Sequence, residues 1–204
     1  MDFDWADSRR AFTDAAGWFV RTAGLVGDRW DRPGLGEWDV RALVGHTSRS
    51  LLTVETYLAR PAAAVEVASA VDYFRATRAT AAGPAVAARG REAGTALGAD
   101  PPAAVAEIAG RVLPLVETRD GDELLTTIAG GMRLADYLPT RTFELAVHTA
   151  DLATALGVPP DVPATAAAQA LRIVAGLAVA EGVAGPLLLG ATGRSGLSAG
   201  FSVL

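Results

Sequence analysis

The chain has 204 residues, of which 18 are basic and 23 acidic, so its formal net charge is −5, and half of its residues are hydrophobic. Every basic residue is an arginine, and no cysteine occurs, which excludes disulfides, thiolate metal ligands and a cysteine nucleophile. No basic patch is evident, so nucleic acid is not an expected partner. The acidic start, MDFDWADSRRAF, lacks a signal-peptide core, and no run of about 20 apolar residues exists, so we expect a cytoplasmic protein without a membrane span.

The predicted elements are almost all helical, as an alanine-rich, aromatic-poor composition favours. In chain order, the expected helices cover about residues 4–26, 40–60, 63–82, 84–97, 102–117, 136–157 and 163–181, with a short one beginning within 185–194. The segment 27–38, with its proline and glycines, is expected to be a loop, and Asp39 is a good N-cap for the helix that follows. Residues 124–131 are expected to form a short extended segment.

This order of elements predicts an all-α fold. Long helices joined by short loops are typical of an up-and-down four-helix bundle, in which sequence neighbours pack antiparallel. We expect extra short helices around the bundle. The chain is predicted to be a single domain over 1–204, with residues 158–204 as a C-terminal helical extension.

The stretch RTFELAVHTADL, residues 141–152, carries a column of polar side chains along one helix face. Arg141, Glu144, His148 and Asp151 follow one another at spacings of three or four residues, and apolar residues lie on both sides. A polar column between apolar flanks is expected to point into the bundle or a cleft. Spacing alone favours an internal pair between Glu144 and His148, and a metal site is the alternative.

The other histidine, His46, lies on a second polar column, with Ser50, Thr53 and Tyr57. It is one of only two histidines in the chain. A single histidine near an apolar stripe is usually structural, but two histidines and a glutamate form a known catalytic zinc set with one open position. Bundle interiors are a recurrent place for such sites. Both interpretations stay open on the residues alone.

Three segments resemble one known family. They are RPGLGEWDVRALVGHTSRS (32–50), in which a tryptophan precedes a histidine by eight residues, MRLADYLPTRTFELAVHTADLATALG (132–157), and the closing GATGRSGLSAGFSVL (190–204). Together they are similar to the mycothiol-dependent maleylpyruvate isomerase N-terminal family, within the DinB/YfiT-like superfamily. The resemblance implies a four-helix bundle whose metal, Zn²⁺ or another divalent ion, is held by His46, Glu144 and His148.

The resemblance also implies mycothiol, a low-molecular-weight thiol of actinobacteria, as co-substrate. The implied activity is a thiol-linked transferase or isomerase, in which the metal favours the thiolate and the thiolate attacks an electrophilic substrate. The family's namesake carries a further small domain after the bundle, which we do not expect here, so the choice between maleylpyruvate and another electrophile stays open. A zinc hydrolase-type enzyme and a non-catalytic metal-binding or regulatory bundle remain alternatives, and a homodimer is the alternative to a monomer.

Two further residues of the polar column are candidates for supporting roles. Arg141 is expected to bind an anionic group of the substrate or to hold Glu144, and a buried ion pair is the alternative. Asp151 is expected to accept a hydrogen bond from a ligand histidine, with helix capping or an arginine pair as the alternatives. Trp38 is interpreted as a packing residue at the start of its helix.

Overall fold

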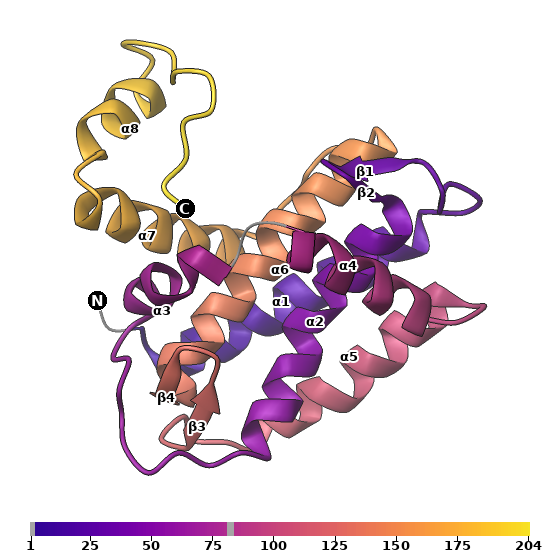
Figure 1. Cartoon of the computed structure of the whole chain (residues 1–204), viewed down its shortest axis with the longest axis horizontal. Helices are drawn as coiled ribbons and strands as arrows, with labels where there is room; N and C mark the ends of the chain where they lie inside the picture. Colours follow the sequence, from indigo (N-terminus) through magenta and orange to yellow (C-terminus); the bar gives the residue numbers. More distant parts are fainter. Residues whose placement is uncertain (1–2, 81–83) are drawn as a thin grey trace.

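The computed structural model describes residues 3–80 and 84–204, and almost all regular structure within them is helical (Figure 1). The helices are α1 (Trp5–Gly24), α2 (Val40–Leu58), α3 (Ala70–Thr77), α4 (Pro84–Ala96), α5 (Pro101–Glu117), α6 (Leu134–Leu156), α7 (Ala164–Ala180) and α8 (Ala184–Ala191), and a 3₁₀ turn, η1, covers Arg78–Thr80. Two small hairpins are formed by β1 (Pro33–Leu35) with β2 (Trp38–Asp39) and by β3 (Leu124–Thr127) with β4 (Gly130–Arg133). The expected all-α fold is confirmed.

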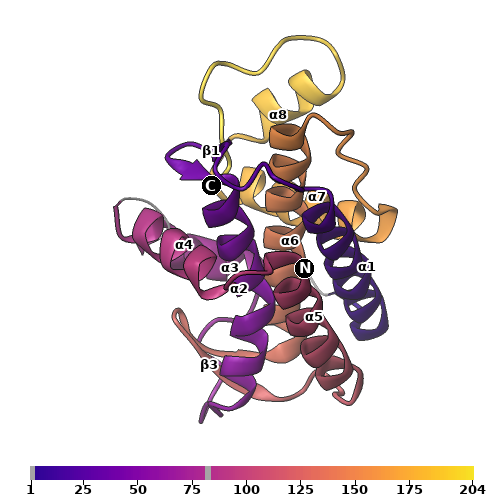
Figure 2. The same ribbon diagram turned by 90° about the vertical axis from the view of Figure 1, so that its right-hand side faces the viewer.

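Four helices form the bundle. Helix α1 packs against α5 and α6, and α2 packs against the same two helices. Helices α1 and α2 therefore lie at opposite corners, as Figure 2 shows. The centre of the bundle is filled by large side chains with no exposed surface, among them Phe12, Phe19, Leu43, Leu51, Leu138 and Leu145. This apolar interior is what the spacing of hydrophobic residues on each helix predicts.

The directions of the helices depart from simple alternation at one point. Arg41, at the start of α2, donates to the carbonyl of Gly98 just before α5, and Glu55 near the end of α2 pairs with Arg111 of α5. Helices α2 and α5 thus run parallel, because residues 59–100 carry the chain back along the bundle before α5 begins. Helix α6 runs antiparallel to α2, since Tyr137 near its start donates to Thr53 at 3.0 Å.

Part of this returning segment is not helical as expected. Residues 63–69 of the predicted helix over 63–82 are irregular, and the rest forms α3 and η1, while residues 81–82 lie outside the described residues. The backbone of this segment pairs with the second hairpin instead: Ala62 donates to Leu124 at 3.0 Å, and Glu66 to Gly131 at 2.8 Å. Hydrogen bonds to the hairpin replace those of a helix, so tertiary pairing overrides the helical propensity of the alanines.

The helix boundaries that matter for the site follow from local sequence. Asp39 caps α2, because its side chain accepts a hydrogen bond from the backbone N–H of Ala42 at 2.7 Å. Helix α6 begins at Leu134, slightly earlier than expected, and ends at Gly157, whose φ of 70° is the left-handed conformation that glycine adopts readily. These two helices carry all the candidate site residues.

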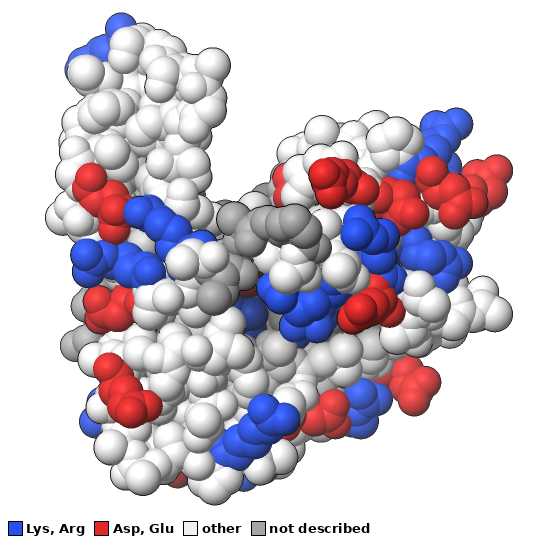
Figure 3. Space-filling view, in the orientation of Figure 1, with Lys and Arg blue, Asp and Glu red and all other residues white. Residues whose placement is uncertain are grey.

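The C-terminal part projects from the bundle. Helix α7 packs against α1 and α6, whereas α8 projects beyond it with a visible surface that is nearly free of charge (Figures 1 and 3). Leu188, Leu189 and Leu197 are exposed there. Across residues 3–80 and 84–204, no helix has the length and hydropathy needed to cross a membrane.

Candidate metal centre

The structure brings His46, Glu144 and His148 together. One potential ligand atom from each lies within 4.8 Å of the other two. Glu144 and His148 are one turn apart on α6, and α2 contributes His46 from across the helix interface. The two imidazole rings lie with their centroids 4.8 Å apart at 85°. Side chains that are about 100 residues apart in sequence therefore converge on a single point between two bundle helices.

The cluster is enclosed but not sealed. The side chains of His148 and Glu144 are 17% and 21% exposed, and His46 is half-buried. A ligand could therefore reach the cluster from solvent, while most of the surface around the three side chains is protein. This partial exposure is typical of a site that keeps a position open for a guest.

Two of the three candidate ligands are in the protonation state that a metal needs. Burial, and next the charge of His148, lower the pKa of His46 to about 4, so its imidazole is neutral at pH 7. Burial opposes ionisation of Glu144, but the hydrogen bond from His148 and the charges of His148 and Arg141 outweigh it and lower its pKa to about 2. A neutral imidazole and a carboxylate are the forms that bind divalent cations.

His148 differs because it lies between two carboxylates. Its Nε2 is 3.2 Å from Oε2 of Glu144, and its Nδ1 is 3.1 Å from Oδ2 of Asp151. Burial opposes its charge, but hydrogen bonds with Asp151 and Glu144 prevail and raise its pKa to about 9. The internal pair that the spacing of Glu144 and His148 predicts is thus present. A cation at Nε2 would replace this proton, while Asp151 would still hold Nδ1.

The donor set fits a divalent metal. Nδ1 of His46 is buried and has no hydrogen-bond partner among the described residues. A buried polar atom without a partner is costly. A cation held beside the carboxylate and the second imidazole would give this nitrogen a partner. Two imidazoles and one carboxylate match the ligands of catalytic zinc sites. His46, Glu144 and His148 are therefore the residues that would hold the ion.

Trp38 covers the histidines, a contact that no pattern in the sequence predicts. Its ring centroid is 4.4 Å from that of His46 and 6.5 Å from that of His148. Its indole N–H donates to the carbonyl of Ala87 on α4 at 3.1 Å. A Cβ on Gly90 would come within 2.6 Å of the indole, so α4 supports the ring closely. The spacing of eight residues between Trp38 and His46 was the only signal in the sequence.

Arg141 lies one turn before Glu144 and makes none of the expected ion pairs. No carboxylate of the described residues lies within 4.0 Å of its guanidinium, so neither Glu144 nor Asp151 pairs with it directly. Its Nε donates to Oγ1 of Thr140 at 2.9 Å. The guanidinium carbon lies 5.0 Å from the ring centre of Tyr137 and 5.3 Å from that of Tyr73.

The tyrosines around Arg141 were not identified as site residues. The chain has three tyrosines, and all three meet here: the Tyr57 and Tyr73 rings lie 5.4 and 5.7 Å from that of Tyr137. Tyr137 is four residues before Arg141, so helical spacing could have predicted that contact. Tyr73 comes from α3, and no local pattern connects it with α6.

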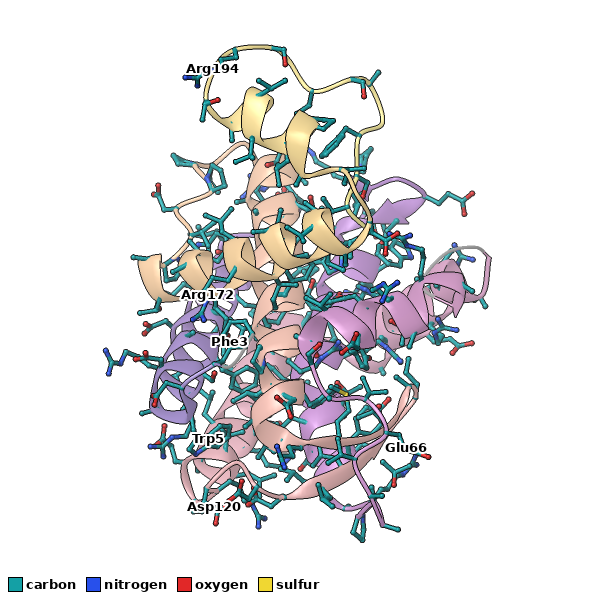
Figure 4. All side chains as sticks on the ribbon, turned by 90° about the vertical axis from the view of Figure 1, so that its left-hand side faces the viewer. Phe3, Trp5, Glu66, Asp120, Arg172 and Arg194 are labelled. Atoms are coloured by element: carbon teal, nitrogen blue, oxygen red, sulfur yellow. The ribbon has the colours of Figure 1, made fainter. Side chains whose placement is uncertain are left out.

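A cavity elsewhere in the molecule is separate from this cluster. It has a volume of about 330 Å³, lies between α1 and α7, and is lined among others by Phe3, Gln169 and Arg172. Figure 4 shows Phe3 and Arg172 near each other, and the guanidinium of Arg172 stacks 4.6 Å from the Phe3 ring. No residue of the candidate metal centre lines this cavity, so the cavity adds nothing to the chemistry of the cluster.

Comparison with known proteins identifies the family. The sequence model described as the mycothiol maleylpyruvate isomerase N-terminal domain matches residues 5–153, which include the bundle and all candidate ligands. Searches of curated proteins and of solved structures returned no match. The helical architecture is consistent with the DinB-like superfamily that the sequence motifs resemble. The chain belongs to the mycothiol maleylpyruvate isomerase N-terminal domain family.

Proposed function

We propose that this protein is a divalent-metal-dependent enzyme that uses a low-molecular-weight thiol, mycothiol, in a transfer or isomerisation reaction. The observation that carries the proposal is the convergence of His46, Glu144 and His148 within 4.8 Å in a partly exposed position. Membership of a mycothiol-associated family supports the choice of thiol. The absence of cysteine from the chain means that the thiol comes from a co-substrate.

A divalent ion at this position would lower the pKa of an incoming thiol and so supply a thiolate at neutral pH. The protein's own residues prepare the site for this role. Glu144 supplies the negative charge, and His46 is held neutral by burial. Asp151 accepts a hydrogen bond from Nδ1 of His148, which orients the ring so that Nε2 faces Glu144. Trp38 restricts the space over both rings.

Metal content tests the first part of the proposal. Purified protein is expected to retain about one divalent ion per chain, as three-ligand zinc sites do. His148→Ala should lose the ion while its circular dichroism spectrum stays helical, because the side chain is at the edge of the core. Elemental analysis that finds no metal in the wild type, or equal metal in the variant, would contradict the site.

Thiol binding tests the second part. Mycothiol should bind the metal-loaded protein at least about tenfold more tightly than protein stripped with a chelator, because coordination stabilises the thiolate. An S-methylated mycothiol is the matched control, since it keeps the rest of the molecule but cannot form a thiolate. Equal affinity of mycothiol for both forms of the protein would exclude direct coordination and would favour a site that activates water.

A further inference from the structure

The two histidines of the candidate metal centre are held in different ways. Nδ1 of His148 lies 3.1 Å from Oδ2 of Asp151, so a carboxylate orients that ring. His46 has no such partner: its Nδ1 is buried without a hydrogen bond, and within the described residues no carboxylate oxygen lies within 4.0 Å of either of its ring nitrogens. The torsion that turns an imidazole has a broad energy profile, so a ring without a hydrogen bond needs another group to fix its orientation.

The indole of Trp38 is the group that lies against the ring of His46. The two ring centroids are 4.4 Å apart, and the ring planes are inclined by only 33°. The ring of His148 meets that of His46 edge-on instead, at 4.8 Å and 85°. Protein interiors are closely packed, so an imidazole that turned out of its plane would drive one edge into the indole. The stacked indole therefore restricts the rotation of His46.

The indole is itself fixed by α4. Its N–H donates to the carbonyl of Ala87 at 3.1 Å. A Cβ on Gly90 would come within 2.6 Å of two indole atoms, so the backbone of α4 lies directly against the ring. The backbone of Trp38 is fixed as well, because the next residue, Asp39, caps the helix that carries His46. Trp38 is thus held both at its backbone and at its ring.

From these contacts we infer that Trp38 is the positioning residue of His46, and that its ring face does for His46 what the carboxylate of Asp151 does for His148. The inference rests on the proposed function only in what the positioned imidazole would bind. The positioning itself is a property of the metal-free protein and is measurable there. Helix α4 contributes to it through the indole, although it supplies no candidate ligand.

Nuclear magnetic resonance of the metal-free protein tests the positioning directly. The chain has only two histidines, so the ring signals of His46 are assigned by comparison with His148→Gln. In the protein with Trp38 intact, the ring protons of His46 should give one sharp set of signals that the indole ring current shifts upfield. In Trp38→Leu, these signals should broaden or split, because the ring samples more than one orientation. One sharp set of signals in Trp38→Leu would overturn the inference.

Metal binding tests the consequence for the site. Trp38→Leu should weaken zinc binding about 10-fold to 100-fold, which is the range for loss of a group that orients a ligand histidine. It should also shift the visible absorption bands of the cobalt-substituted protein, because these bands report ligand geometry and not stability. Trp38→Phe keeps an aromatic face and should recover part of the zinc affinity. Trp30→Leu is the matched control, because Trp30 packs on Arg41 instead.

Two results of the metal experiments would overturn the inference. One is a zinc affinity and a cobalt spectrum that stay unchanged in Trp38→Leu or change equally in Trp30→Leu. The other is an equal loss of zinc affinity in Trp38→Phe and Trp38→Leu, which would mean that the aromatic face plays no part.

A second variant keeps the test valid if Trp38→Leu fails to fold. Gly90→Ala retains the indole but displaces it, since the new methyl group meets the ring within 2.6 Å. It should weaken zinc binding and shift the cobalt bands, whereas Gly110→Ala, with open space around the new Cβ, should bind zinc like the wild type. Unchanged zinc binding in Gly90→Ala would overturn the contribution of α4.

The failure of this inference is distinguishable from the failure of the proposed function. Wild-type protein that retains no zinc would contradict the metal-dependent function. The ring signals of His46 in the metal-free protein would still decide whether Trp38 positions that ring.

Discussion

At the scale of single residues, the proposed metal centre depends on how His148 is held. Asp151 and Glu144 contact its two ring nitrogens at 3.1 and 3.2 Å, so the ring orientation is determined from both sides. The same contacts raise the pKa of His148 to about 9, because both partners are negative. In the metal-free protein at pH 7, His148 therefore carries a proton that a cation has to displace.

This proton predicts a pH dependence of metal binding. Between the pKa of His46, about 4, and that of His148, about 9, one proton competes with the ion, so metal affinity should rise about tenfold per pH unit and level off above pH 9. Calorimetry at pH 7 in two buffers of different ionisation enthalpy should find about one proton released per zinc bound. A proton count near zero would show that His148 is neutral before binding.

A substitution at Asp151 tests how the ring of His148 is held without removing a metal ligand. Asp151→Asn keeps the shape of the side chain but removes its charge, so it should weaken zinc binding about 10-fold to 100-fold, as loss of a carboxylate that orients a ligand histidine does. Competition with a chromophoric chelator measures this change. Asp161→Asn, in the exposed segment before α7, serves as the control and should bind zinc like the wild type. Equal affinities in both variants would mean that Asp151 does not support the site.

At the scale of elements, the site depends on the close crossing of α2 and α4. A Cβ on Gly45 would lie 2.1 Å from the backbone nitrogen of Gly94, and one on Gly94 would lie 2.7 Å from the carbonyl oxygen of Arg41. The two backbones touch, and this contact lies next to His46. Helix α4 in turn supports Trp38 over the histidines. The returning segment between α2 and α5 thus forms one wall of the candidate metal centre.

The crossing predicts a large difference between two glycine substitutions. Gly45→Ala should destabilise the protein by about 1–3 kcal/mol, because the methyl group meets backbone that has to move. Gly110→Ala is the matched control: it lies on α5 with open space around the new Cβ, and should stabilise by about 0.5–1 kcal/mol. Urea unfolding measures both. Comparable stabilities of the two variants would contradict the close crossing.

At the scale of the whole molecule, a metal ion would join two helices that are far apart in the sequence. His46 belongs to α2, while Glu144 and His148 belong to α6, so a bound ion would connect two neighbouring helices of the bundle that are far apart in the sequence. The unfolded chain cannot hold the three ligands together without paying loop-closure entropy. Binding free energy should therefore appear as folding stability.

Thermal unfolding tests this connection. Zinc at about 100 times its dissociation constant should stabilise the fold by about 2.7 kcal/mol and raise the melting temperature by roughly 5–10 °C relative to chelator-treated protein. His46→Ala should abolish this shift because it removes the only ligand from α2. A melting temperature that does not respond to zinc, or an equal response in the variant, would argue against an ion that bridges the two helices.

The sequence alone determined the helices and the order of candidate ligands, because these depend on local chemistry. Apolar spacing predicted α1 and α2, prolines and glycines delimited α5 and α6, and the spacing of Glu144, His148 and Asp151 placed them on one face. His46 was singled out by its own polar column, and the family resemblance then implied it as a ligand. These signals lie within a few residues of one another, where helical geometry fixes which side chains are neighbours.

Only the tertiary structure decided what those residues face. The pairing of residues 62–67 with the second hairpin, the parallel course of α2 and α5, and the position of α4 under Trp38 all depend on contacts between distant segments. The same holds for Tyr73, which reaches Arg141 from α3, and for the absence of a carboxylate beside that guanidinium among the described residues. Local spacing cannot predict such contacts, since they arise from the packing of whole helices and hairpins.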